Sequence, residues 1–178
     1  MSTRGAVGII FNGESKIGYS HYDSYPEGLG ASVLEFLKKH DMESLKYIFN
    51  EIKLDGDHNE VWNDNKNCFN YSFADNEAFL YDSLFCEYAY IINLDTGNLE
   101  FYKGFNTNPK GKGRYVKLGK HVCEPFTIVN SKGEKTKVKK KTYYGVNLKK
   151  EIPLENIKEY SIKNNSFVKR RNYEKACK

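Results

Sequence analysis

Three short turn sequences, each set between β-prone segments, constrain the fold of this chain more than any other feature. They are NGES at 12–15, DTGN at 95–98 and SKGE at 131–134. Asparagine, aspartate and glycine tolerate the left-handed backbone that tight hairpin turns require. The flanking segments are GAVGIIF and KIGYSHY, EYAYIINL and LEFYKGF, and PFTIVN and KVKKKTYYGV. These segments are rich in strand-favouring residues, so the sequence predicts three β-hairpins.

Between the first two hairpins the apolar pattern changes to the period of a helix. One stripe, in residues 31–41, contains Val33, Leu34, Phe36 and Leu37, and a second, in residues 42–53, contains Leu45, Ile48, Phe49 and Ile52. A short helix is predicted to start at Pro153, in PLENIKEYS. The order is an N-terminal hairpin, two helices, further hairpins and a short C-terminal helix. That order predicts an α+β fold with a mainly antiparallel sheet.

The length of 178 residues fits a single α+β domain spanning 1–178, but charge is distributed unevenly along it. Residues 1–102 hold seven Lys and Arg against 17 Asp and Glu, a net charge of −10. Residues 103–178 hold 21 against six, a net charge of +15. An asymmetry of this size predicts two surfaces with different roles. It leaves open whether 103–178 forms an appended subdomain or the two halves neutralise each other within one fold.

The sequence lacks the patterns that several functional classes require. No apolar run is long enough for a membrane helix, and the first residues lack a signal-peptide pattern. The scattered cysteines, Cys68, Cys86, Cys123 and Cys177, favour reduced thiols in a cytoplasm. The pairs His21/Asp23 and His121/Cys123 do not make a zinc set, so neither a metal nor a cofactor is predicted. Phosphate-binding P-loop, G-x-S-x-G and H-E-x-x-H motifs are absent.

The segment YSHYDSYPEGLG, at 19–30, concentrates polar and aromatic residues between a predicted strand and a predicted helix. Proline favours an extended residue before it, and the two glycines permit a sharp turn. Free N–H groups at the start of the helix favour an anion. The segment therefore predicts a site for an anionic, nucleotide-like ligand, with a purely structural turn as the alternative. Its candidate ligand-binding residues are His21, Asp23, Tyr25, Gly28 and Gly30, of which the first three are expected to share one face of the incoming strand.

The same segment supports a different hypothesis, a hydrolase. A histidine beside a carboxylate is a common acid–base pair, here His21 and Asp23. Removal of Met1 would expose Ser2, and an N-terminal serine can act as a nucleophile with its own α-amine as the base.

The chain resembles a widespread group of short phage and bacterial proteins. The resemblance is carried by STRG near the start, by Y-x-H-Y-D-S-Y-P-x-G-L-G, by VLEFL and by FCEYAYIINLDTGNLEFYKGF, and covers roughly residues 1–105. Members share an N-terminal Thr-Arg, here Thr3 and Arg4, and an aromatic-Asp-Gly/Ser-Tyr-Pro-x-x-x-Gly motif before the first helix. Thr3 and Arg4 are therefore added to the candidate ligand-binding residues of the turn. Because the group has no agreed activity, the resemblance implies a fold and a site location only. In a central first strand, Arg4 would require an acidic or phosphate partner such as Asp23 or Glu87.

The C-terminal part combines lysines with tyrosines, a pattern typical of nucleic-acid binding. The candidate phosphate-binding and base-stacking residues are Arg114, Lys135, Lys137, Lys139, Lys141, Tyr143 and Tyr144. The four lysines are expected to line one face of a strand. The alternative is a solvated edge hairpin, since lysines also protect sheet edges from aggregation.

The sequence thus predicts a small cytosolic binding protein for an anionic, nucleotide-like or nucleic-acid partner. The phage resemblance suggests interference with host defence in the host cytoplasm, by sequestering a nucleotide signal or by blocking a host protein complex. The alternatives are the hydrolase and a plain nucleic-acid-binding protein. No membrane partner is predicted, and the number of subunits stays open.

Overall fold

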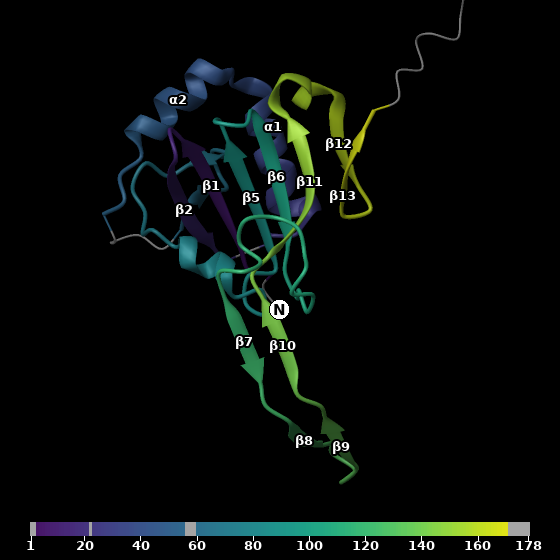
Figure 1. The fold of residues 1–178 in the computed structure, drawn as a ribbon. Helices are drawn as coiled ribbons and strands as arrows, with labels where there is room; N and C mark the ends of the chain where they lie inside the picture. Colours follow the sequence, from purple (N-terminus) through teal and green to yellow (C-terminus); the bar gives the residue numbers. More distant parts are fainter. Residues whose placement is uncertain (1–2, 22, 56–59, 171–178) are drawn as a thin grey trace, which may run out of the picture.

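The computed structural model describes residues 3–21, 23–55 and 60–170, and its centre is a five-stranded sheet (Figure 1). The first predicted hairpin is formed by β1 (Gly5–Phe11) and β2 (Glu14–Ser20), and the second by β5 (Tyr88–Asn93) and β6 (Asn98–Lys103). Strand β11 (Asn147–Pro153) pairs with β6, which gives the order β11-β6-β5-β1-β2. The predicted α+β fold with a mainly antiparallel sheet is confirmed.

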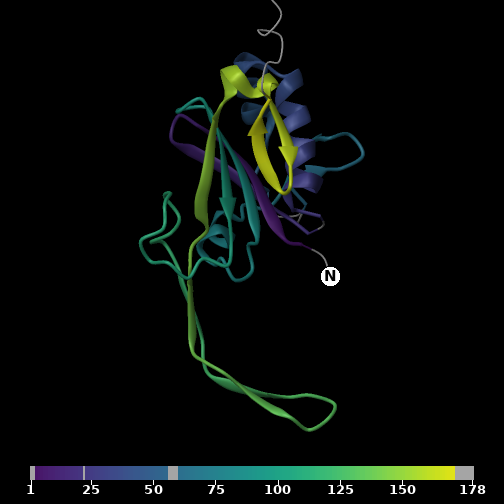
Figure 2. The same ribbon diagram turned by 90° about the vertical axis from the view of Figure 1, so that its right-hand side faces the viewer.

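The one parallel pairing in the sheet joins β1 to β5, with Val7 opposite Tyr90. Parallel neighbours need a long crossover, and here it contains α1 (Ala31–Lys39) and α2 (Met42–Glu51). Both helices fall where the apolar periodicity predicts them. Figure 2 shows them against one face of the sheet.

Both faces of the sheet are buried. On the helix face, Val7, Ile9, Tyr90, Ile92, Leu99 and Phe101 pack with helix residues that include Val33, Leu37, Leu45 and Phe49. On the opposite face, Ala6, Ile10, Ile17, Ala89, Ile91 and Tyr102 pack with Leu80, Cys86, Tyr115 and Val146. Strands covered on both sides have few outward positions for polar residues. This explains the nearly continuous apolar sequences of β1 and β5.

Short elements complete the body of the molecule. They are the π-helix η1 (Pro26–Gly30), the pair β3 (Trp62–Asn63) and β4 (Cys68–Phe69), the 3₁₀ helices η2 (Glu77–Tyr81) and η3 (Leu154–Glu159), and the pair β12 (Tyr160–Lys163) and β13 (Ser166–Lys169). The predicted C-terminal helix is therefore a short 3₁₀ helix. The β12–β13 hairpin was not predicted, although its turn residues Asn164 and Asn165 have φ values of 51° and 53°, which asparagine tolerates.

A long two-stranded ribbon projects from the body (Figures 1 and 2). Its inner part pairs β7 (Lys120–Cys123) with β10 (Lys141–Tyr144), and its outer part pairs β8 (Phe126–Val129) with β9 (Lys135–Val138). The outer pair is the third predicted hairpin. We call residues 120–144 the arm.

The basic portion 103–178 is interleaved with the acidic half, because its strand β11 forms an edge of the central sheet. The arm is the part of it that leaves the body. The end of the basic tail, with Cys177, lies outside the described residues. None of the helices in the described ranges is long and apolar enough to cross a membrane.

Candidate nucleic-acid interface

The base of the arm is bound to the body on both strands. The Tyr144 N–H donates to the Asn106 carbonyl (2.8 Å), and the Tyr144 carbonyl accepts from the Ser83 N–H (3.1 Å). On the neighbouring strand, His121 Nδ1 lies 2.7 Å from Asp82 Oδ2. These contacts fix the point and the direction in which the arm leaves the folded core.

Halfway along the arm the ladder of hydrogen bonds is interrupted. The inner pairing ends with Cys123 opposite Lys141, and the outer pairing starts with Phe126 opposite Val138. Pro125 lies in the gap, and proline has no N–H to donate to a ladder. Figure 2 shows that the arm curves in its outer half. We attribute this bend to the interruption.

The turn at the tip is specified by Asn130. Its side-chain oxygen accepts hydrogen bonds from the N–H groups of Lys132 (3.0 Å) and Glu134 (2.9 Å). Gly133 has a φ of 78°, which glycine adopts without a steric penalty. The turn thereby fixes the register of β8 against β9, and the register decides which side chains share a face.

The outer arm has two chemically different faces, because directly opposed residues in an antiparallel pair share a face. The apolar face consists of Phe126, Ile128, Thr136 and Val138, and the lysine face consists of Thr127, Val129, Lys135 and Lys137. Phe126 and Ile128 are 54% and 50% exposed. A two-stranded hairpin standing alone gains little from burial. The apolar side chains of the arm are therefore accessible to a partner.

The arm carries a net positive charge, with seven lysines and two glutamates between residues 120 and 144. Lys140 pairs with Glu124 across the interruption (2.9 Å), and Lys141 Nζ lies 4.9 Å from the Tyr143 ring centroid. Within the described part of the chain the other arm lysines form no ion pair with a carboxylate. Their charge is therefore available to an external polyanion.

The four lysines predicted to line one strand are only partly assembled. Lys135 and Lys137 share the lysine face of β9, whereas Lys139 lies between strands and Lys141 belongs to β10. The prediction of a single lysine-lined strand is wrong, because the interruption at Pro125 separates the arm into two ladders.

The other predicted nucleic-acid residues lie closer to the body. Tyr143 is only 9% exposed, so its ring offers no accessible face to a base. Tyr144 is half-buried at the base of the arm. Arg114 lies in the connection between β6 and β7, where its guanidinium donates to the buried carboxylate of Glu100. The predicted stacking by Tyr143 is therefore not available in this conformation, and Arg114 already has a structural partner.

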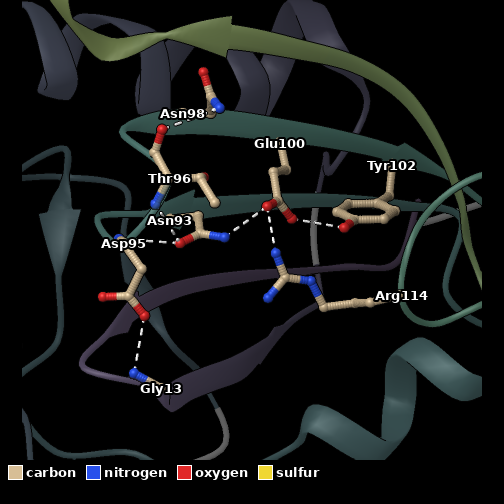
Figure 3. A network of polar contacts seen from close by, with 8 residues as sticks. All are labelled: Gly13, Asn93, Asp95, Thr96, Asn98, Glu100, Tyr102 and Arg114. Atoms are coloured by element: carbon tan, nitrogen blue, oxygen red, sulfur yellow. Dashed lines mark hydrogen bonds and ion pairs between the residues drawn. The ribbon is translucent and has the colours of Figure 1, made fainter.

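Glu100 is the centre of a polar network on the sheet face opposite the helices (Figure 3). Its side chain is 3% exposed, and it accepts hydrogen bonds from Asn93 Nδ2 (2.7 Å), from the Tyr102 hydroxyl (2.6 Å) and from Arg114. Burial and the hydrogen bond to Glu100 raise the pKa of Tyr102, which keeps its hydroxyl a donor. Burial opposes the charge of Arg114, but the Glu100 carboxylate raises the pKa of Arg114 overall. Sequence reasoning missed this network, although a glutamate within the apolar strand LEFY was a signal of a buried charge.

The predicted site at 19–30 has a different backbone from the one expected. Strand β2 ends at Ser20, and Asp23 adopts a φ of 44°, so the prediction that His21, Asp23 and Tyr25 share a strand face is wrong. The physical reason is the tight turn, in which the Leu29 N–H donates to the Asp23 carbonyl (2.9 Å).

Several backbone donors of this turn are already used. The N–H groups of Gly28 and Gly30 both donate to the Tyr25 carbonyl, at 3.0 and 3.4 Å. The turn is also joined to the segment before β1, since the Ser24 N–H donates to the Thr3 carbonyl (3.1 Å). These N–H groups are therefore not free to bind an anion in this conformation. Ligand binding at the turn stays a prediction.

Arg4 faces an acidic residue, as predicted for the start of a central strand. Its Nε lies 3.9 Å from Glu87 Oε1, and its guanidinium lies 5.1 Å from the Phe85 ring centroid. The partner is Glu87 and not Asp23, which makes no hydrogen bond or ion pair through its side chain within the described residues. Arg4 therefore links the start of β1 to the segment before β5.

The residues of the hydrolase hypothesis are not assembled as a pair. His21 Nδ1 lies 2.8 Å from the Tyr19 hydroxyl, and the His21 N–H donates to Glu60. No hydrogen bond joins His21 to Asp23 in the described part of the chain. Ser2 lies outside the described residues, so its role as a nucleophile stays a prediction.

Sequence reasoning missed the carboxylate–histidine pair that the structure does contain, Asp82 and His121. A carboxylate can orient an imidazole as a general base. The neighbouring thiol of Cys86 is fully buried, and burial raises its pKa, so it stays protonated and cannot act as a nucleophile. No local pattern links Asp82 to His121, because the two residues are distant in the sequence. We assign the pair to anchoring the arm.

A hollow of about 480 Å³ lies between the α1–α2 turn and η3. Its lining includes Lys39, His40 and Lys158, but also the carboxylates Asp41 and Glu155. None of the residues predicted for ligand binding lines it. Its mixed charge does not favour an anionic ligand over other small molecules.

Comparison of the chain with protein-family models, with curated proteins and with solved structures finds no match. Within the described residues, no group of three or more His, Cys, Asp or Glu side chains is placed to hold a metal ion.

Proposed function

We propose that the protein binds nucleic acid through the arm. The observation that supports this function is the placement, on a ribbon that stands clear of the body, of lysines that have no carboxylate partner among the described residues. Lys132 lies in the tip turn, Lys135 and Lys137 lie on the lysine face, and Lys139 follows β9. Phosphates of a nucleic-acid backbone match such a row of flexible cations.

Salt dependence provides the direct test. Each phosphate that a lysine neutralises releases a counterion, with a slope of log affinity against log salt of about −0.9 per contact on duplex DNA and about −0.7 on a single strand. The variant Lys132→Gln, Lys135→Gln, Lys137→Gln, Lys139→Gln should reduce the slope by roughly three units if most of these lysines meet phosphates. Fluorescence anisotropy with labelled DNA, over a series of salt concentrations, measures the slope.

A matched control separates the arm from the total charge. Lys39, Lys53, Lys66 and Lys158 are exposed lysines of the body, and replacing all four with Gln removes the same charge. The proposal expects a slope close to that of the wild type for this control. Equal slopes for the arm variant and the control would refute it, and so would a wild-type protein that binds no nucleic acid at low salt.

Nucleic-acid binding would fit the role that the phage resemblance suggests, interference with a host complex that handles nucleic acid. That role, the host cytoplasm as its location and the nucleotide-like ligand at 19–30 stay predictions.

A further inference from the structure

The apolar face of the arm has no role in the binding described so far. Phe126 and Ile128 project from it, with Val138 opposite Phe126. Four of the ten large hydrophobic side chains exposed in the described part of the chain lie in the arm: Val122, Phe126, Ile128 and Val129. Phe126 and Ile128 lie on the apolar face, whereas Val129 lies on the lysine face and Val122 in the inner arm. Exposed apolar side chains that share a face can form a surface that contacts a partner.

Positive charge surrounds this face and identifies the kind of partner. Lys132 lies in the turn beyond it, and Lys139 lies at its other end, where β9 stops. Lys135 and Lys137 project from the reverse side of the same strand, and their four-carbon stems can bend around the edge of the ribbon. The apolar face, bordered by cations, is complementary to nucleic-acid bases bordered by phosphates.

The side chains of the apolar face favour duplex nucleic acid over a single strand as the partner. Single-strand binders stack successive bases on several aromatic rings. The apolar face has one aromatic ring, that of Phe126, beside the aliphatic side chains of Ile128 and Val138. Tyr143 is buried and so adds no second ring. Apolar wedges of Phe, Ile or Pro instead enter the minor groove of duplex DNA, separate neighbouring base pairs and kink the helix. Pro125, immediately before Phe126, stiffens the backbone at that point.

We infer that the arm lies along the minor groove of duplex DNA with its apolar face toward the bases, and that Phe126 enters between two base pairs and bends the duplex. This inference rests on the proposed nucleic-acid function and specifies its substrate class. The minor groove of duplex RNA is wide and shallow, so it gives a narrow ribbon no walls to grip.

The test is a bending measurement on a DNA duplex of about 30 base pairs, far shorter than its persistence length of about 150 base pairs. Donor and acceptor dyes at the two ends report bending through energy transfer. The wild-type protein should increase the transfer, as expected for a bend of roughly 20–90°. Phe126→Ala should still bind the duplex with the wild-type salt slope but should leave it straight.

Val129→Ala is the matched control. Val129 lies on the same strand and is 56% exposed, against 54% for Phe126, but it belongs to the lysine face. This variant should bend DNA like the wild type. Loss of bending in both variants would overturn the face assignment, and a bound but straight duplex with the wild-type protein would overturn the wedge.

The remaining outcomes separate this inference from the proposed function. A single strand that binds more tightly than the duplex, and that Phe126→Ala weakens most, would keep nucleic-acid binding and overturn the wedge. A Phe126→Ala variant that dissociates a dimer in sedimentation, with bending intact, would assign the apolar face to a second copy of the chain. Absence of all nucleic-acid binding would overturn the proposed function and the inference together.

Discussion

The Glu100 network allows a structural role for Arg114 to be distinguished from a role in phosphate binding. In Arg114→Met the carboxylate of Glu100 stays buried but loses its cationic partner. Removing one member of a buried ion pair typically costs about 3–5 kcal/mol. Here the cost should be smaller, because the Arg114 side chain is 41% exposed and two neutral donors remain on the carboxylate. We therefore expect a loss of about 2–3 kcal/mol in the free energy of unfolding.

Urea titration followed by circular dichroism measures this loss directly. For a chain of this size the same change corresponds to a decrease in Tm of roughly 4–12 °C. Glu100→Gln combined with Arg114→Met removes the buried charge together with its partner, so the double variant should be more stable than the sum of the single losses predicts. Additive losses would show that the two side chains do not interact in the folded protein.

The same variant has a functional readout. Because Arg114 is bound to Glu100, Arg114→Met should leave the salt slope of DNA binding unchanged. A slope reduced by about 0.9 would indicate a lost phosphate contact. That result, with unchanged stability, would refute the structural role and restore Arg114 to the nucleic-acid interface.

Two further predictions concern local structure. A Cβ at position 28 would lie 2.2 Å from the Asp23 carbonyl oxygen. Gly28→Ala should therefore lower the free energy of unfolding by about 1–3 kcal/mol, measured by urea titration. An unchanged unfolding midpoint would contradict the close approach. Asp41 caps α2, and its hydrogen bond with Ser44 lowers the pKa of Asp41 from 3.8. The stabilisation of the folded protein by this cap is therefore present above pH 3.8 and is lost as the pH falls through the lower pKa of the folded state. Melting curves of the wild type and Asp41→Ala should differ at neutral pH and converge in acid; a difference that persists in acid would exclude this linkage.

The hairpins and helices could be predicted because their signals are local. Asn12, Gly97 and Gly133 lie in turns and have positive φ values, which their residue types tolerate. The pairing of β1 with β5 and of β11 with β6 joins segments far apart in the chain. No short pattern specifies which strand becomes the neighbour of another, so the sheet order could not be derived from the turns.

The candidate site was predicted incompletely for the same reason. Lysines at every second position indicated one strand, but the partner strand contributes Pro125, which interrupts the ladder. The turn SKGE predicted the hairpin, and its register then determines which residues share a face with Phe126. Tyr143 was expected to be accessible because its sequence neighbours are lysines. Its burial depends on the body packed against the base of the arm, which the sequence of the arm does not contain.

The distribution of ion pairs bears on how the two oppositely charged halves of the chain are related. If the halves neutralised each other, lysines of the basic half would pair with carboxylates of the acidic half. Within the described residues, most ion pairs of Lys and Arg join residues of the same half, such as Lys38 with Glu35 and Lys140 with Glu124. The ion pair between Arg114 and Glu100 joins the two halves. The positive charge of the arm is thus held away from the acidic half. Holding like charges together on a thin ribbon raises its free energy, and the polyanion binding that we propose for the arm would offset this cost.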